Sequence, residues 1–161
     1  HRIAIWNRTT ARAEMLAANL RAVGLPAEAV TDLDGEASRA DIISCVTMSD
    51  RPLVKGALLK PGAHLDLVGA YLPSMREADD TALARATLFT DAKSNMRGGG
   101  DLVQAVAAGV IGWSDVRADL FDLIQDRATG RQTAEEITLF KNNGGAHLDV
   151  FTAAALLQLV G

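Results

Sequence analysis

The chain has 161 residues, of which 48% are hydrophobic and 22% charged, a composition typical of a globular protein with one sizeable core. The formal net charge is −4, and Lys and Arg residues are scattered, which argues against a nucleic-acid partner or an anionic membrane surface. The single cysteine, Cys45, excludes an internal disulfide, and no apolar stretch reaches the roughly 18 residues that a membrane span needs, so we expect a cytoplasmic protein.

The first part of the chain predicts alternating strands and helices. Residues 2–6 are an apolar run that ends in polar residues, as a buried strand does at the carboxyl edge of a sheet. Apolar positions at helical spacing follow over residues 13–23, with Thr9 or Thr10 as the cap and Gly24 as the stop. Further along we expect a weak strand near residues 27–30, a short helix over 33–39 and a strand buried on both faces over 41–46.

The same alternation continues to the end of the chain. Residues 63–68 and 87–90 are predicted as strands and residues 77–85 as the helix between them. Residues 94–130 are predicted to be mostly helical, with a mobile break at residues 98–100. A last strand over 136–141 and a closing helix over 146–160 complete the series. This pattern favours the α/β class, with a doubly wound parallel sheet.

Four blocks of sequence carry a resemblance to a known family. They are residues 5–9 (IWNRT), 44–48 (SCVTM), 64–77 (HLDLVGAYLPSMRE) and 140–144 (FKNNG). In this order and at these separations they closely resemble the ornithine cyclodeaminase/mu-crystallin family. A four-block match is far harder to reach by chance than one short motif. The resemblance implies a Rossmann-type fold, a dinucleotide-dependent oxidoreductase of amino-acid metabolism, and a homodimer in the intact protein.

The glycine-rich loop of a Rossmann-type fold is the one expected feature that the sequence lacks. Such a loop directs backbone N–H groups at the pyrophosphate, and neither glycine run, at residues 98–100 or 144–145, has the required placement. Since the resemblance begins at the family's second strand, we expect the first strand, the loop and the substrate and dimerisation domain to lie upstream. Residues 1–161 are therefore interpreted as a partial NAD(P)-binding domain that is inactive alone.

Asn7, Arg8 and Thr9 follow the first predicted strand, where doubly wound folds bind the adenosine ribose. An acidic residue there binds the 2′-hydroxyl of NAD, whereas an arginine accommodates the 2′-phosphate of NADP. The planar guanidinium of Arg8 suits a phosphate, so the sequence favours NADP(H) over NAD(H). The alternatives are a solvated Arg8 and a Thr9 that simply caps the following helix.

Three further segments are cofactor-binding candidates by resemblance. Thr47 lies in the segment that faces the adenine side of the cofactor in the family, although a threonine that satisfies turn amides is an equal alternative. Val68, Gly69 and Ala70 match the segment that flanks the nicotinamide, where a glycine lets a ring approach the backbone. Asn142 falls where the family usually has a serine near the nicotinamide carboxamide.

Tyr71 marks a departure from the cyclodeaminases, whose matching aspartate acts on the substrate amine. A phenol carries no negative charge near neutral pH. We therefore expect a ketimine reductase-like enzyme that reduces a small cyclic imino acid, such as pyrroline- or piperideine-2-carboxylate. The alternatives are ornithine cyclodeaminase, which yields proline and ammonia, and a non-enzymatic dinucleotide-binding protein of the crystallin type. Tyr71 is the candidate catalytic residue, and the catalytic acid or base stays open.

Several other polar residues are interpreted as structural. His64 and Asp66 share one face of a strand, but no third ligand has a helpful spacing for a metal ion. Lys141 is expected to be a solvated or structural charge, and Arg76 and Glu77 are expected to cap or brace the helix that follows them. His147 is likewise expected to be structural.

Overall fold

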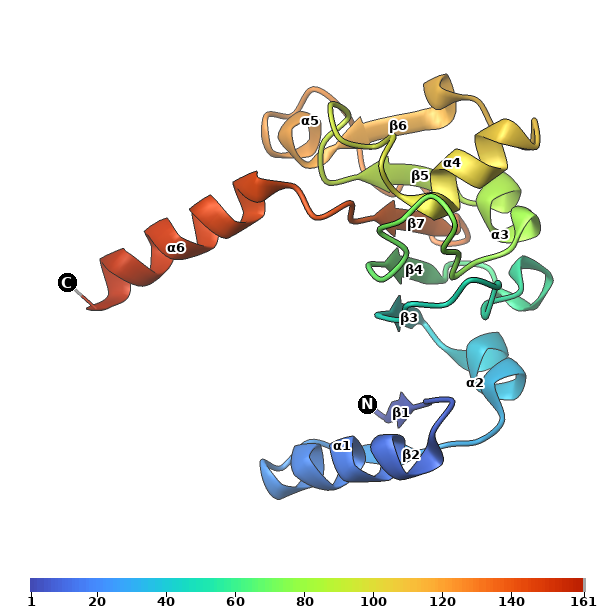
Figure 1. Cartoon of the computed structure of the whole chain (residues 1–161), viewed down its shortest axis with the longest axis vertical. Coiled ribbons are helices and arrows are strands. Elements are labelled where there is room, and N and C mark those ends of the chain that lie inside the picture. Colours follow the sequence, from blue (N-terminus) through green and yellow to red (C-terminus); the bar gives the residue numbers. More distant parts are fainter. Residues whose placement is uncertain (161) are drawn as a thin grey trace. The chain divides into compact units, whose positions relative to one another are not determined.

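Seven β-strands, all paired in parallel, form the framework of residues 1–160, the part of the chain that the computed structural model describes (Figure 1). They form two sheets, which belong to two structural units, His1–Ala40 and the residues from Asp41 onward. This arrangement confirms the predicted α/β class with parallel strands.

The first unit consists of two strands and two helices. β1 (Ile3–Ile5) pairs with β2 (Ala27–Ala29), and α1 (Thr10–Ala22) connects them. Ala13 and Ala17 of the predicted apolar face of α1 are fully buried, whereas Leu16 and Val23 of the same face are 47% and 73% exposed. Gly24 follows the helix with φ +84°, a left-handed conformation that suits glycine. α2 (Leu33–Arg39) has the predicted bounds.

The second unit contains a five-stranded sheet in the order β3-β4-β7-β5-β6. Its central strand, β7, is the last in sequence, and it pairs with β4 on one side and β5 on the other. The strands are β3 (Ile42–Cys45), β4 (His64–Leu67), β5 (Thr87–Thr90), β6 (Val116–Asp119) and β7 (Thr138–Lys141). Because all five are parallel, their carboxyl ends lie at one edge.

Leucine side chains of the strands and helices form the core of this unit. Leu65 and Leu67 point to the same face of β4 and are fully buried, as the alternation in this strand predicted. They belong to one cluster with Leu139 of β7, Leu83 of α3 (Asp80–Arg85) and Leu102 of α4 (Gly100–Ala107). The core therefore fixes the strands whose ends carry the candidate site.

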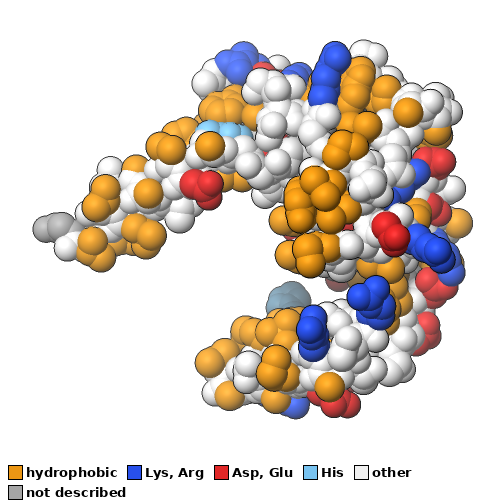
Figure 2. Space-filling model, viewed as in Figure 1, with side chains coloured by type: hydrophobic (Ala, Val, Ile, Leu, Met, Phe, Trp, Pro, Cys, Tyr) orange, Lys and Arg blue, Asp and Glu red, His pale blue; other side chains and the backbone are white. Residues whose placement is uncertain are grey.

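The last helix, α6 (Ala146–Val160), has the predicted bounds and extends away from the sheet (Figure 1). Hydrophobic side chains lie along its length on the face that Figure 2 shows. Its exposed hydrophobic residues are Val150, Phe151, Leu156, Leu157, Leu159 and Val160. No helix within residues 1–160 is both long and apolar enough to cross a membrane.

The prediction of a mostly helical region over residues 94–130 was wrong. This region contains α4, a 3-10 turn at Trp113–Asp115, the strand β6 and the short helix α5 (Leu120–Ile124). The four residues of β6 carry little strand pattern of their own. They form a strand because they pair with β5, and pairing of that kind overrides local preference.

Three local predictions also need correction. β3 is not buried on both faces: it is an edge strand of its sheet, and Ile42 is 69% exposed. The helix expected from residue 77 begins at Asp80, because the N–H groups of Glu77 and Ala78 donate to Asp101 instead. Finally, Gly100 is not a break, since it is buried and begins α4.

Candidate active site at the carboxyl edge of the sheet

The ends of β3, β4 and β7 bring together segments that are distant in sequence. The parallel register aligns Cys45 of β3 with Leu67 of β4, and Leu67 with Lys141 of β7. Beyond this level the N–H of Asn142 donates to the carbonyl of Leu67 over 2.9 Å, and this bond extends the contact between the two strands. The candidate residues that the structure places at this one edge are Thr47, Val68, Gly69, Ala70 and Asn142.

Gly69 lies where the loops after β3 and β4 make their closest approach. A Cβ atom added to this glycine would lie 1.7 Å from the carbonyl oxygen of Thr47 and 2.4 Å from its nitrogen. No side chain fits there without moving the backbone of Thr47. From the family resemblance, we expected this glycine to allow the nicotinamide ring to approach the backbone. The structure adds a second reason, since the glycine lets the two loops pack against each other.

Glu77 joins the same two loops. Its carboxylate accepts hydrogen bonds from the N–H and the hydroxyl of Thr47, over 2.6 and 2.8 Å, and from the N–H of Gly69 over 2.8 Å. The side chain is fully buried. The prediction that Glu77 caps or braces the following helix was therefore wrong, whereas Arg76 does brace it through an ion pair with Asp80. The only sequence signal for Glu77 was its fixed place in the block at residues 64–77.

Tyr71 lies on the rim of the site. Its side chain is 53% exposed, and the hydroxyl lies 4.0 Å from the sulfur of Met48. The N–H of Tyr71 donates to the carbonyl of Gly69 over 3.0 Å, so the backbone turns tightly after the glycine. Ala70, between them, is buried, and its carbonyl accepts the N–H of Gly100 at the start of α4. The phenol thus faces solvent from an ordered turn.

Asn142 shapes the loop that follows β7. Its side-chain oxygen accepts the N–H of Gly144 over 2.8 Å, and Gly144 has φ +72°. Nearby, Asp91 follows β5 and accepts hydrogen bonds from Asn143 and Gly145. Burial acts to raise the pKa of Asp91, but these bonds outweigh it and hold the pKa below its usual range. The loops after β5 and β7 are thus joined by a buried carboxylate.

Asn7, Arg8 and Thr9 belong to the first unit and follow β1. The side-chain oxygen of Asn7 accepts the N–H of Thr9 over 2.8 Å, which shapes the turn between β1 and α1. Thr9 occupies the N-cap position, but its side chain makes no capping hydrogen bond, so the expected side-chain cap is absent. Within residues 1–160, no hydrogen bond or ion pair engages the exposed guanidinium of Arg8.

A family model described as the ornithine cyclodeaminase/mu-crystallin family matches residues 1–158. The chain belongs to this family. Among curated proteins, a Delta(1)-pyrroline-2-carboxylate reductase of Paracoccus denitrificans is 41% identical over 160 residues, which are 99% of this chain and 51% of the relative. The chain spans about half the length of the curated relatives it matches.

Solved structures of the ornithine cyclodeaminase/mu-crystallin family share the fold. The Delta(1)-pyrroline-2-carboxylate reductase of Thermococcus litoralis, in complex with NADH and L-proline, matches with a TM-score of 0.89 at 27% identity, covering 94% of this chain and 47% of that one. The iminosuccinate reductase of Paracoccus denitrificans, in complex with NAD+, matches with a TM-score of 0.88 at 31% identity, covering 99% and 48%. Both relatives thus hold a nicotinamide dinucleotide.

Apolar side chains are exposed at the carboxyl edge of the sheet. Val46 and Met48, after β3, are 72% and 74% exposed and offer apolar surface to a flat ring. The Cβ direction of Gly69 points at the backbone of Thr47 and the carboxylate of Glu77, so the glycine serves the packing of the two loops. In open parallel sheets, ligands bind outside the carboxyl ends of the strands, which is where these residues lie.

Lys141 lies at the same edge of the sheet, and its environment could not be predicted from the sequence. The expected alternatives were a solvated or a structural charge, and the second holds, because the side chain is fully buried. Its ammonium lies 3.3 Å from the carboxylate of Asp101, which is also fully buried. The pairing joins the last position of β7 to the first turn of α4, and sequence reasoning singled out neither Asp101 nor this contact.

His64 and Asp66 have separate partners and do not form a pair. Nδ1 of His64 lies 2.8 Å from the hydroxyl of Thr138, and Asp66 accepts a hydrogen bond from Ser44 over 2.8 Å. Burial lowers the pKa of His64. Among the described residues, no group of three or more His, Cys, Asp or Glu side chains is arranged to hold a metal ion.

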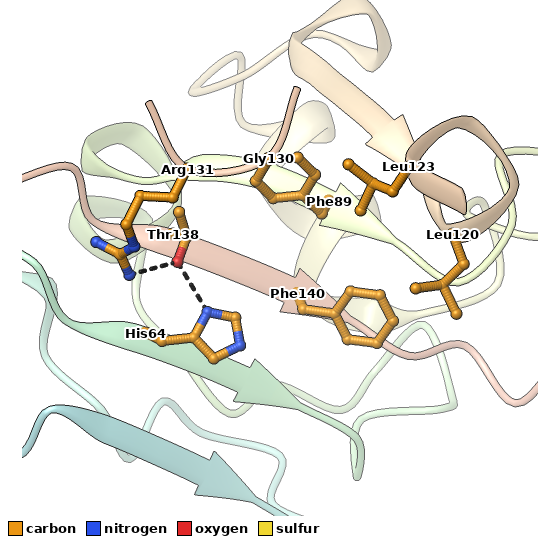
Figure 3. A pocket seen from close by; sticks show the side chains of 8 residues that line it. All are labelled: His64, Phe89, Leu120, Leu123, Gly130, Arg131, Thr138 and Phe140. Atoms are coloured by element: carbon orange, nitrogen blue, oxygen red, sulfur yellow. Dashed lines mark hydrogen bonds between the residues drawn. The ribbon is translucent and has the colours of Figure 1, made fainter. Parts of the chain in front are cut away.

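A pocket of about 480 Å³ lies apart from this edge (Figure 3). Figure 3 shows Arg131 and His64 converging on Thr138 at one end and apolar side chains at the other. His64 and Thr138 are the first residues of β4 and β7, whereas Leu120 and Leu123 belong to α5, which follows β6, so the pocket extends along the strands. Its lining consists of His64, Phe89, Leu120, Leu123, Gly130, Arg131, Thr138 and Phe140.

Proposed function

We propose that the intact protein reduces a small cyclic imino acid, of the pyrroline-2-carboxylate or piperideine-2-carboxylate class, to the corresponding cyclic amino acid. A bound NAD(P)H supplies a hydride to the carbon of the C=N bond, the nitrogen takes up one proton, and the nicotinamide is left oxidised. The observation that carries this proposal is Tyr71, which stands on the exposed rim where an aspartate would serve deamination. The reductases among the relatives support it.

The residues of this chain would bind and orient the reactants. Gly69 and Ala70 would offer the backbone against which a nicotinamide ring lies, and the side-chain amide of Asn142 would meet its carboxamide. Thr47 contributes its backbone and the adjacent apolar surface to the adenosine half. Tyr71 covers the rim, and the proton donor and the substrate carboxylate site are assigned to the rest of the protein.

We also propose that the cofactor is NADPH in preference to NADH. The observation in favour is the exposed Arg8 after β1, with no carboxylate in the turn at residues 7–9 to repel a 2′-phosphate. The hydroxyl of the N-cap residue Thr9, which makes no capping hydrogen bond, is a further donor in the same turn.

The remaining proposals concern the whole protein. Residues 1–161 would form part of an NAD(P)-binding domain, and a second domain would supply substrate and homodimer contacts in a cytoplasmic enzyme. The exposed apolar side chains of α6 support this view, because a helix that is apolar on most sides is usually buried against other protein. The open edge of β3 supports a further strand beside it in the intact protein.

The test is an assay of the purified full-length protein. Oxidation of NADPH with pyrroline-2-carboxylate and with piperideine-2-carboxylate is measured beside ammonia release from ornithine. We expect NADPH oxidation above background with at least one imino acid and no ornithine-dependent ammonia. Ammonia release with background reductase activity would favour a cyclodeaminase, and dinucleotide binding without either reaction would favour a crystallin-type binding protein.

A further inference from the structure

Glu77, Asp101 and Lys141 form a buried charge cluster behind the loops of the candidate active site. All three side chains have 0% exposure. They come from three separate segments: the loop before α3, the first turn of α4 and the last position of β7. Because burial of an ionised group costs free energy unless it is paired, the partners of each group indicate what the cluster does.

The cluster connects β7 to the loops of the candidate site in two steps. The first step is the ion pair between Lys141 and Asp101. One carboxylate oxygen of Asp101 lies 3.3 Å from the Lys141 ammonium. The other oxygen accepts the backbone N–H groups of Glu77 and Ala78, over 2.8 and 3.2 Å. Lys141 therefore balances the charge of a carboxylate that fixes the backbone at residues 77–78.

The second step runs from Glu77 to the two loops of the site. Its carboxylate accepts the N–H of Thr47 through one oxygen and the N–H of Gly69 through the other. Since the side chain is fully buried, water cannot replace these bonds without opening the structure. The N–H of Gly100, beside Asp101, also donates to the carbonyl of Ala70, so α4 contacts the same loop.

We propose that Glu77, Asp101 and Lys141 are positioning residues that hold the backbone of Thr47 and Gly69 in the conformation that binds a dinucleotide. The proposal rests on the proposed function only for the identity of this ligand. The three side chains act through the backbone of the loops, and none of them is exposed at the edge where the ligand would lie.

The variant Glu77→Gln in the full-length protein tests the second step. Hydrogen exchange of the Thr47 and Gly69 amides is measured without ligand, and the NADPH dissociation constant is measured by calorimetry. Loss of charge-assisted bonds should speed exchange at both amides about 10-fold or more and weaken NADPH binding by about 10-fold. Unchanged exchange and unchanged affinity would overturn the proposal.

Glu136→Gln is the matched control. Glu136 also accepts a backbone N–H, from Gln132, and a threonine hydroxyl, from Thr87, but it precedes β7 and lies at the amino ends of the strands. Even if its melting temperature falls, exchange at Thr47 and Gly69 and the affinity for NADPH should stay within about 2-fold of the wild type. Equal effects from both glutamines would reduce Glu77 to a general structural residue and overturn the proposal.

A pair of variants tests the first step. Lys141→Met leaves the Asp101 carboxylate buried without its counter-charge, whereas Lys141→Met/Asp101→Asn removes both charges and keeps an oxygen to accept the N–H of Glu77. The double variant should melt at a higher temperature than the single one and bind NADPH more tightly. If the double variant is no better than the single one in both measurements, or if Lys141→Met matches the wild type, the role of Lys141 is refuted. A wild type that binds no dinucleotide would instead refute the proposed function, because the exchange measurements need no ligand.

Discussion

Cys45 is a buried thiol at the last position of β3. It is 7% exposed, and burial, together with the negative charges of Glu77 and Asp101, raises the pKa of the thiol to about 12. A thiol with this pKa presents almost no thiolate at neutral pH, and the thiolate is the reactive form. The residue therefore has the properties of a structural side chain and not those of a nucleophile.

We predict that Cys45 reacts with a disulfide reagent at pH 8 on the order of 1,000-fold more slowly in the native protein than in guanidinium chloride. The rates are read from the absorbance of the released thiol. A native rate close to the denatured rate would show that β3 opens readily or that the thiol is ionised.

Arg8 is the residue on which the cofactor preference depends. We predict that Arg8→Asp in the full-length protein narrows or reverses a preference for NADPH, with a loss of about 10- to 100-fold in NADPH affinity. The loss reflects both a missing charge-assisted contact and a new repulsion. Calorimetric titration of NADPH and NADH into both proteins measures it, and equal affinities in the wild type would contradict the prediction.

Substitution of Tyr71 can distinguish a role in packing from a role as proton donor. The hydroxyl of Tyr71 is on the exposed rim and lies 4.0 Å from the sulfur of Met48. We predict that Tyr71→Phe keeps reductase activity within about 10-fold of the wild type, whereas loss of a general acid would cost about 100-fold or more. Steady-state rates with the imino-acid substrate decide between the two.

At the level of secondary-structure elements, the candidate site consists of the strand ends and the loops that follow them. The loops after β3 and β4 pack directly on each other at Gly69, and the loops after β5 and β7 are joined by Asp91. Substitutions at Gly69 and Asp91 therefore test the two junctions.

We predict that Gly69→Ala moves the loop after β3, because its Cβ would overlap the carbonyl of Thr47. Overpacking of this kind costs about 1–3 kcal/mol of stability and should weaken NADPH binding by at least about 10-fold. Gly130→Ala is the control, since a Cβ there meets nothing within 4 Å. Thermal unfolding and calorimetry compare them, and equal effects would contradict the close approach at Gly69.

Asp91 should make the junction of β5 and β7 sensitive to acid. Hydrogen bonds hold its folded pKa below the unfolded value, so the unfolded state binds more protons as the pH falls. The contribution is complete above the unfolded pKa of about 4 and is lost as the pH falls through the lower folded pKa. Urea midpoints from pH 7 to pH 2 should fall less steeply for Asp91→Asn than for the wild type; parallel curves would contradict this.

At the scale of the molecule, local patterns and remote contacts were not equally predictable. The bounds of α2, β5 and α6 follow from short, regular runs of residues, and the structure has them where the sequence placed them. β6 depends on its partner β5, so its own four residues did not reveal it. The sequence did not reveal the partner of Lys141, because Asp101 lies 40 positions earlier and approaches it only in the folded protein.

Of the candidate site, the sequence predicted the segments but not what holds them. The strand ends at Thr47, Gly69 and Asn142 follow from apolar runs that stop at polar or glycine residues. Glu77 receives its hydrogen bonds from residues 30 and 8 positions away, and no periodicity encodes such distances. Contacts of this kind become visible only when β3 and β4 are placed side by side.

The 161-residue chain on its own should bind NADPH at best weakly and turn over no substrate. No glycine loop in residues 1–161 directs backbone donors at the pyrophosphate. Calorimetry on the isolated chain tests this prediction, and micromolar affinity would contradict it.

The exposed apolar side chains of α6 lead to a separate prediction. The 161-residue chain should bind a hydrophobic dye through them, and the double substitution Leu156→Lys/Leu159→Lys should reduce the fluorescence of the bound dye.

The central place of β7 has a consequence for how the protein acquires its fold. β4 and β5 do not pair with each other, and both pair with β7, which is synthesised after the other strands of this sheet. Until then the nascent chain holds two separate strand pairs, β3 with β4 and β5 with β6, each with an open edge. Pairing across so many residues is slow, so we expect a chain that stops before Thr138 to leave these two strand pairs unjoined and prone to aggregate.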